Sequence, residues 1–377
     1  MMQRRNFIFS TAAMIGHAAF AARTEPGISD REILLGQSIV STGPYSVAAL
    51  AMQGGMKVAF GESNARGGIA GRQLRLVSLD DGLVPARAAA NYKALLREHQ
   101  VFACVLGAGA GTTLAGLPIL KEAGAPLIGA TTVVDSVRDK TEGVAYYTRA
   151  SQLRESDALV THLATIGIQR IAVAHIGTPG GQEALSQLDA AATRHKLRLT
   201  GSIPVAPDGK DAGDAGKALA HMDAQVVIMF LSGSPAAEVM KSVWAQGAAP
   251  SFYGMSILAG DVTAKLLGDQ SKGLTISQVT PYPWDTADPD VNSYRKGCAA
   301  AQVPVGYHSY EGYLAGRTAI EALRQAGHDL TRERLHTALR RLKVRIGGMD
   351  LDFSNGRYTG SDFVELVRVR NDGKFVR

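Results

Sequence analysis

The sequence predicts an α/β protein made of two lobes, each with a parallel β-sheet flanked by helices. Short apolar runs alternate with stretches of helical periodicity, and strand–helix–strand alternation is typical of parallel sheets covered on both faces. The 377 residues exceed the usual size of a single hydrophobic core, and 46% hydrophobic with 20% charged residues is an ordinary globular composition. Because no low-complexity linker separates two halves, we expect the chain to cross between the lobes more than once.

Two helices in the first half of the chain are predicted from apolar residues that recur on one helical face. Leu50 and Phe60 lie on the apolar face of one helix, which ends before Gly67, and Leu159 and Leu163 lie on the apolar face of the other. Helical periodicity predicts helices at residues 48–64, 85–99, 156–166, 235–246 and 311–326. Apolar runs bounded by turn residues predict strands at residues 33–39, 74–79, 101–106, 125–130, 170–175, 224–231, 251–255 and 275–279.

The amino terminus reads as an export signal at residues 1–21. Arg4 and Arg5 precede an apolar stretch without acidic residues, which ends at the small-x-small sequence Ala19 to Ala21. The apolar part is too short for a membrane span, and no Cys follows it to carry a lipid anchor. Both a twin-arginine signal and a general secretory signal fit. We therefore expect a periplasmic protein.

The charge pattern argues against a polyanionic partner. The formal charge is +6, and removal of the two signal arginines lowers it to +4. Lys and Arg are dispersed and do not alternate with aromatic residues as in a nucleic-acid groove. The two cysteines, Cys104 and Cys298, could pair in an oxidising compartment, but Cys104 lies in an apolar run, which favours a buried thiol.

The glycine-rich segment 107–116 (GAGAGTTLAG) follows a predicted strand. It lacks the Lys that a nucleoside-triphosphate loop requires. Gly107, Gly109, Gly111 and the downstream Asp135 partly match a dinucleotide fingerprint, although the third glycine is misplaced. Small residues also expose the amides of a helix start, where the helix dipole favours a carboxylate as well as a phosphate. A tight turn with a Thr cap and no ligand remains an alternative.

A second segment of this kind is 129–132 (GATT), at the end of the next strand. Ligands of open α/β sheets collect at the carboxyl ends of parallel strands. Thr112 and Thr113 in the first segment, with Thr131 and Thr132 in the second, therefore form a candidate binding site.

A set of short stretches extends through nearly the whole chain after the signal: 33–38 (ILLGQS), 41–44 (STGP), 64–74 (NARGGIAGRQL), 80–81 (DD), 126–129 (PLIG), 149–151 (RAS), 167–173 (GIQRIAV), 277–281 (SQVTP), 309–313 (SYEGY) and 347–353 (GGMDLDF). With these stretches the chain resembles the leucine/isoleucine/valine-binding family of periplasmic substrate-binding proteins of ABC transporters.

The resemblance implies a type I periplasmic binding protein fold, with two Rossmann-like lobes and three hinge crossings near Thr148, Val279 and Asp362. Lobe 1 is expected at 29–148 and 281–361, and lobe 2 at 149–280 and 362–377. The ligand is expected in the cleft between the lobes. The implied partner is an ABC permease in the inner membrane, with the chain a monomer that needs no cofactor and no metal and is not an enzyme.

In such a fold the first lobe commonly binds a ligand carboxylate through a helix amino terminus and nearby hydroxyls. The resemblance puts these contacts at Ala110, Gly111, Thr112, Thr131 and Thr132. The full set of candidate ligand-binding residues is Tyr45, Ala110, Gly111, Thr112, Thr113, Thr131, Thr132, Gln152, Thr178, Ser232, Ser234 and Ser256.

The second lobe departs from the amino-acid binders. The acid that holds an α-ammonium group is missing at Ser256, and no acid follows until Asp261. Segments 175–181 and 231–235 carry Gly where a Tyr often covers the ligand. An ammonium buried without a carboxylate costs several kcal/mol, so we expect a small carboxylate-bearing or polar solute, amino-acid-like or an organic or aromatic acid.

Two other functions remain open at this stage. One is an exported dinucleotide-dependent oxidoreductase, which fits twin-arginine export but has no fingerprint before Asp80 and Asp81. The other is a ligand-sensing subunit that docks to a membrane receptor. Hydrolase and metal motifs are absent from the sequence, and His175 at a strand end reads as structural or as a ligand contact.

Overall fold

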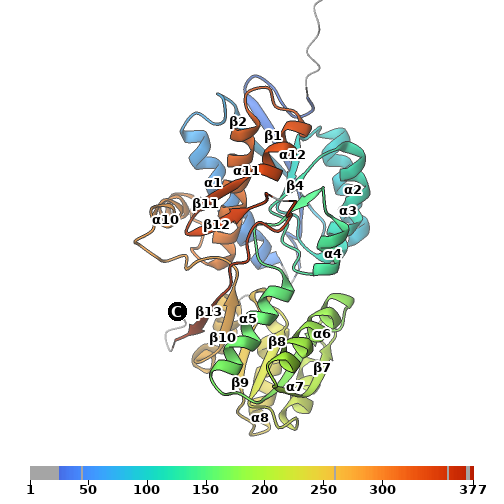
Figure 1. Ribbon diagram of the computed structural model, residues 1–377, viewed down its shortest axis with the longest axis vertical. Coiled ribbons are helices and arrows are strands. Elements are labelled where there is room, and N and C mark those ends of the chain that lie inside the picture. The colour runs from blue at the N-terminus through green and yellow to red at the C-terminus, as the bar shows by residue number, and fades with distance from the viewer. Residues whose placement is uncertain (1–24, 44–45, 259, 355, 371–373) are drawn as a thin grey trace, which may run out of the picture.

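The first of two large sheets is wholly parallel. The computed structural model describes residues 25–43, 46–258, 260–354, 356–370 and 374–377 (Figure 1). In the order β2-β1-β3-β4-β5, the sheet contains β1 (Glu32–Ile39), β2 (Gln73–Asp80), β3 (Ala103–Val105), β4 (Leu127–Ile128) and β5 (Ala145–Tyr146). Leu35 pairs with Leu76 on one side and with Ala103 on the other, so β1 lies inside the sheet.

Helices cover both faces of this sheet because successive strand residues point to opposite sides. Ala103 and Val105 belong to one hydrophobic cluster, and Cys104 between them belongs to another. The first cluster includes residues of α1 (Ser46–Ala65), α10 (Pro289–Ala301), α11 (Tyr307–Ala326) and α12 (Arg332–Arg341). The second includes residues of α2 (Pro85–Lys93), its π-helical continuation (Ala94–Glu98) and α3 (Ala110–Ala123).

Two glycines let α1 and α11 cross closely. A Cβ on Gly55 would lie 1.7 Å from the carbonyl oxygen of Ser309, and one on Gly312 would lie 1.8 Å from that of Met52. Both distances are far inside van der Waals contact, so the crossing requires glycine at both positions. A short antiparallel pair, β11 (Lys343–Ile346) and β12 (Met349–Asp352), follows α12.

The second sheet is mixed and has the order β14-β13-β10-β9-β8-β6-β7. Its parallel part contains β6 (Arg170–Ile176), β7 (Arg198–Val205), β8 (Val226–Phe230), β9 (Ser251–Gly254) and β10 (Thr275–Gln278). β13 (Glu365–Val369) runs antiparallel to β10, and β14 (Phe375–Val376) runs antiparallel to β13.

The second sheet is also covered on both faces. Val173 packs with α5 (Gln152–Thr165) and α6 (Pro179–Arg194), whereas Ala172 and Ala174 pack with α7 (Ala212–Ala220), α8 (Gly233–Ala245) and α9 (Gly260–Leu267). The remaining elements are α4 (Asp135–Lys140) and two 3-10 turns at Ser256–Leu258 and Gly268–Ser271.

The two sheets and their helices form two lobes stacked along the long axis of the molecule (Figure 1). The chain passes between the sheets three times: from β5 to α5, from β10 to α10, and from β12 to β13. The predicted fold class is therefore confirmed, with an antiparallel edge as an addition. Boundaries of the lobes at 148, 280 and 361 remain a prediction.

Most of the predicted strands and helices coincide with observed ones, but several elements were not predicted. The run 125–130 forms a strand only at Leu127–Ile128, and the helix predicted at 156–166 already begins at Gln152. Cys104 and Cys298 are buried and form no disulfide within the described chain. The predicted signal at 1–21 and Tyr45 lie outside the described residues. Of the helices that the structure describes, none is long and apolar enough to span a membrane.

Candidate functional site

The glycine-rich segment turns directly into the amino terminus of α3. Gly109 is the residue before the helix and has φ 85° and ψ 145°, a conformation that side chains strongly disfavour. No side chain of the described residues caps this helix start. Ala110 is half-buried and Gly111 is exposed. Because their amides are among the first of the helix, they have no hydrogen-bond partner inside it.

The threonines of this segment turn their hydroxyl groups inward. Thr113 Oγ1 donates to the carbonyl of Gly109 over 2.6 Å, and Thr112 Oγ1 bonds to the carbonyls of Ala108 and Gly109. Both side chains are buried. The polar groups that face outward at this helix start are therefore backbone amides, and these favour an anion.

The second predicted segment is tied to the first. The backbone N and the Oγ1 of Thr131 both donate to the carbonyl of Gly107, over 2.9 and 3.2 Å. Thr132 is 3% exposed, and its Oγ1 finds no hydrogen-bond partner among the residues that the structure describes. A buried hydroxyl without a partner is costly, so it marks a place where a ligand or water can bind.

Asp135, the acid considered for the dinucleotide fingerprint, forms contacts between helices. Its Oδ2 accepts hydrogen bonds from the backbone N of Leu153 over 2.9 Å and from Nε2 of Gln187 over 3.1 Å. These bonds join the start of α4 to α5 and α6. A structural role therefore accounts for one oxygen of this acid, Oδ2.

Gln152 and Thr178 lie at the helix starts of the second lobe. Thr178 caps α6 by accepting from the backbone N of Gly181 over 3.2 Å. Gln152 Nε2 donates to the carbonyl of Gly180 over 3.3 Å, while its Oε1 is buried and lacks a partner within the described chain. A Cβ on Gly180 would lie 2.9 Å from Cγ2 of Val134, so this edge of the second lobe touches the segment after Thr132.

The two serines near α8 are less enclosed. Ser232 precedes the helix, is half-buried and makes no side-chain cap to the described residues. Ser234 lies in the first turn and is exposed. His175, at the end of β6, is buried and contacts the carbonyl of Ile176 through Nδ1 at 3.0 Å, which supports a structural role.

Ser256 lies in a buried polar network, and its contact with a ligand remains a prediction. Its Oγ donates to Oε1 of Glu155 over 2.8 Å and also accepts from Arg149. Glu155 Oε2 accepts from the backbone N of Ser256 over 2.8 Å and from Ser277 Oγ over 2.7 Å. The hydroxyl of Ser256 thus donates its proton to Glu155 and uses one of its two acceptor positions for Arg149.

This network joins the two lobes through residues that were not predicted. Arg149, on the first crossing, forms ion pairs with Glu155 of α5 at 3.2 Å and with Glu311 of α11 at 3.0 Å. All three side chains are at least nine-tenths buried. Their stretches, 149–151 and 309–313, appeared in the sequence only as family matches, because nothing local indicates that they meet.

Arg138 forms further hydrogen bonds in the same region. Its Nε donates to the carbonyl of Thr132 over 2.9 Å, and its terminal nitrogens donate to the carbonyls of Arg149 and Ala150 and to Thr359 Oγ1. Its guanidinium also lies 4.5 Å from the ring centre of Tyr147. Burial, and next the nearby charge of Arg149, lower the pKa of Arg138 to about 10.

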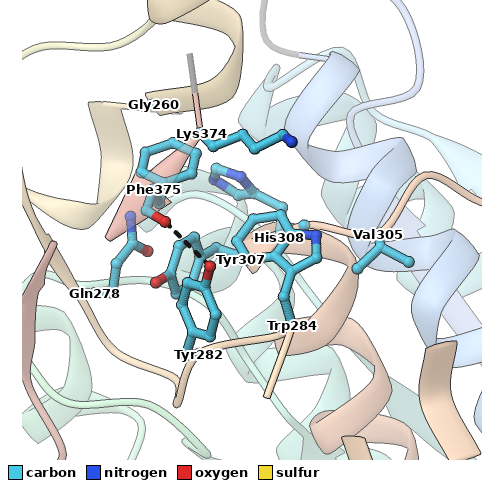
Figure 2. Close-up of a pocket in the computed structure, with 10 residues that line it drawn as sticks. Gly260, Gln278, Tyr282, Trp284, Val305, Tyr307, His308, Lys374 and Phe375 are labelled. Atoms are coloured by element: carbon cyan, nitrogen blue, oxygen red, sulfur yellow. Dashed lines mark hydrogen bonds between the residues drawn. The ribbon is translucent and has the colours of Figure 1, made fainter. Parts of the chain in front are cut away.

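A separate cavity of about 370 Å³ lies between the lobes (Figure 2). Its walls are mainly aromatic, and its lining residues all differ from the predicted set: Gly260, Gln278, Tyr282, Trp284, Val305, Gly306, Tyr307, His308, Lys374 and Phe375. We call it the aromatic cavity. The sequence did not predict this cavity, because its lining comes from four segments that are far apart in the chain.

Comparison with known proteins identifies the family of this chain. The family model described as periplasmic binding protein matches residues 32–374, which is nearly all of the chain. This chain is a periplasmic binding protein. A search of the curated proteins found no match.

Solved structures agree with this assignment. A possible leucine/isoleucine/valine-binding protein from Rhodopirellula baltica is 26% identical to this periplasmic binding protein, with a TM-score of 0.84, and 94% of this chain and 98% of that one are covered. A substrate-binding periplasmic protein from Ralstonia solanacearum is 28% identical, with a TM-score of 0.84 and coverage of 92% and 99%. A solute-binding protein of an ABC transporter from R. palustris in complex with benzoate shares the fold at 19% identity, with a TM-score of 0.81 and coverage of 92% and 95%.

Proposed function

We propose that this periplasmic binding protein takes up a small carboxylate-bearing or polar solute between its lobes and delivers it to an ABC permease in the inner membrane. The proposal rests on the uncapped amino terminus of α3 and on the buried Thr132 hydroxyl, which has no partner in the described chain. The two segments are linked, because Thr131 donates to the carbonyl of Gly107, two residues before the helix cap Gly109. We further propose export through the signal at 1–21 and action as a monomer.

The α3 terminus suits a carboxylate for a physical reason. The first backbone amides of a helix lack partners inside the helix, and the helix dipole places partial positive charge on them. The amides of Ala110 and Gly111 can donate to one carboxylate oxygen, and Thr132 Oγ1 can donate to the other. Each such contact contributes about 0.3–1 kcal/mol at an exposed site and more when buried.

The second lobe favours a solute without an ammonium group. The buried acid next to Ser256 is Glu155, and its two oxygens already bind Arg149, Ser256 and Ser277. An ammonium group there would compete with a buried arginine for the same carboxylate. A carboxylic acid with an apolar or aromatic body avoids this cost. A protein of the same fold is described in complex with benzoate, and another is described as a fatty acid transporter component.

Thermal unfolding with a set of solutes tests the proposal. Benzoate, 4-hydroxybenzoate, valine and leucine are added in turn to the wild type and to the variant Thr132→Val. We expect a carboxylate without an ammonium group to raise the Tm of the wild type, because a ligand that binds only the folded state stabilises it. The rise should be smaller in Thr132→Val, which lacks one donor to the carboxylate.

The matched control is Thr165→Val, which removes an exposed hydroxyl that bonds to the carbonyl of Thr161 at the end of α5. This variant should keep the full ligand-induced rise in Tm. An equal rise in Thr132→Val and the wild type would reject the proposed site, even if the protein binds the solute elsewhere.

A further inference from the structure

The aromatic cavity lies away from the site proposed for the solute. Tyr307 and His308 begin α11, which covers the opposite face of the first sheet from α3. In the second lobe, Gln278 is the last residue of β10, and Phe375 lies in β14, the edge strand of the sheet. Thr178, which belongs to the candidate solute site, follows β6 near the other edge of the sheet. Tyr282 and Trp284 lie on the second crossing between the lobes, so both lobes and their connection line the cavity (Figure 2).

The walls of the cavity hold one another in place. The Trp284 ring stacks on Phe375 with centroids 6.0 Å apart, and Tyr307 meets both rings edge-on at 5.6 and 5.5 Å. Tyr282 lies 5.2 Å from Trp284, and its hydroxyl donates to the carbonyl of Phe375 over 3.0 Å. Trp284 and Tyr282 are nevertheless only half-buried, so ring surface remains open toward the cavity.

One polar group at the cavity is left without a partner. Tyr307 is 7% exposed, and its Oη makes no hydrogen bond to any residue in the described ranges. Gln278, 5% exposed, also lines the cavity with its side-chain amide. A volume of about 370 Å³ lies within the range of small-molecule sites, which are apolar and carry a few polar groups that set orientation.

We propose that the aromatic cavity is a second ligand site, which binds a single aromatic ring bearing a hydroxyl group. The ring packs against Trp284 and Phe375, and its hydroxyl accepts the hydrogen bond that Tyr307 Oη cannot make in the free protein. This site does not depend on the function proposed above. Because the ligand touches both lobes, it favours the arrangement of the lobes in which the cavity is formed.

The test uses phenol as the probe and the two tryptophans of the chain as reporters. In ¹H–¹⁵N spectra of the full chain, the indole signals of Trp244 and Trp284 are told apart with Trp244→Phe. We expect phenol to shift the Trp284 signal saturably and to leave the Trp244 signal in place. Cyclohexanol, which has a hydroxyl but no aromatic ring, should bind at least about fivefold more weakly, since an aromatic contact contributes about 1 kcal/mol.

Two variants test the hydrogen bond from Tyr307 and the independence of the two sites. Tyr307→Phe should weaken phenol binding about fivefold, the loss of one hydrogen bond, and leave toluene binding unchanged. Thr132→Val should bind phenol as the wild type does, so failure of the solute site and failure of this one are told apart. A Trp284 signal that does not move up to the solubility limit of phenol, equal shifts of both tryptophans, or unchanged phenol binding in Tyr307→Phe would overturn the proposal.

Discussion

Nη1 of Arg149 lies 3.0 Å from Oε1 of Glu311, and this ion pair joins the first crossing between the lobes to α11 of the first lobe. Both side chains are less than one-tenth exposed. The guanidinium also pairs with Glu155 of the second lobe, so a single cation is held by acids from both lobes. Any rearrangement of the lobes therefore has to keep or break this contact.

Replacing Arg149 by Met should destabilise the fold by about 3–5 kcal/mol. The substitution leaves the carboxylates of Glu155 and Glu311 buried without their cation, and removing one partner of a buried pair costs this much. Denaturant unfolding measures the loss as a lower midpoint. The exposed Arg66, changed to Met, is the control and should stay within about 0.5 kcal/mol of the wild type. A midpoint for Arg149→Met equal to that of Arg66→Met would contradict a structural role for the pair.

Two neighbouring tyrosines of α11 should respond in opposite ways to loss of the hydroxyl group. Tyr307→Phe removes a buried hydroxyl that lacks a partner in the described chain, so it should stabilise the protein by about 1 kcal/mol. Tyr310→Phe removes a hydroxyl that donates to the carbonyl of Gly347 over 2.9 Å, so it should destabilise by about 1–3 kcal/mol. Unfolding midpoints of the pair provide the measurement. A loss of stability in Tyr307→Phe would mean that the hydroxyl is satisfied in solution.

Gly109→Ala should cost about 1–3 kcal/mol, because Gly109 has φ 85° and a Cβ there would lie 2.9 Å from Cδ2 of Leu83. The matched control is Gly61→Ala in α1, where the added Cβ meets no atom within 4 Å. Alanine should stabilise a helix interior at that position by about 0.5–1 kcal/mol. Thermal or denaturant unfolding of both variants checks the difference in sign, and a stabilised Gly109→Ala variant would count against the described conformation of the glycine-rich segment.

Acid sensitivity should depend on Asp80. Hydrogen bonds from the backbone N of Ser41 and from Thr42 Oγ1 hold the pKa of Asp80 well below its usual range. A carboxyl whose pKa is lower in the folded than in the unfolded state stabilises the protein above a pH of about 4, and this contribution is lost as the pH falls toward the folded pKa. Burial raises the pKa of the adjacent Asp81, so that residue acts in the opposite direction.

The wild type should therefore lose more stability than Asp80→Asn between about pH 6 and about pH 3. Denaturant unfolding at both values gives the comparison. Equal losses in the two proteins would show that the bonds to Asp80 do not lower its pKa in solution.

The sequence predicted the strands and helices whose apolar patterns are long and locally complete. β1 and β2 begin one residue before the predicted runs and end at most one residue later. β1 is buried on both faces, and the edge strand β2 pairs with β1 along its whole length. The run 125–130 is equally apolar, yet only Leu127 and Ile128 pair as a strand. The length of a hydrogen-bonded ladder depends on the neighbouring strands, which local composition does not encode.

The parts of the site that could be predicted lie in single segments, and those that could not are assembled from distant ones. The glycine-rich segment before α3 follows from its own residues. The contact between Arg149 and Glu311 joins residues 162 positions apart, and the aromatic cavity combines Trp284 with Phe375. The contact between Ser256 and Glu155 joins residues 101 positions apart, so the spacing of residues in the sequence could not predict it.

The most direct test of the account follows the backbone amides at the start of α3 while benzoate is added. In ¹H–¹⁵N spectra of the full chain, we predict that the amides of Ala110 and Gly111 show the largest saturable shifts, since they donate to the carboxylate. Saturable binding of benzoate with these two amides unmoved, and with the shifts gathered at the Trp284 indole instead, would contradict the central claim that α3 holds the solute.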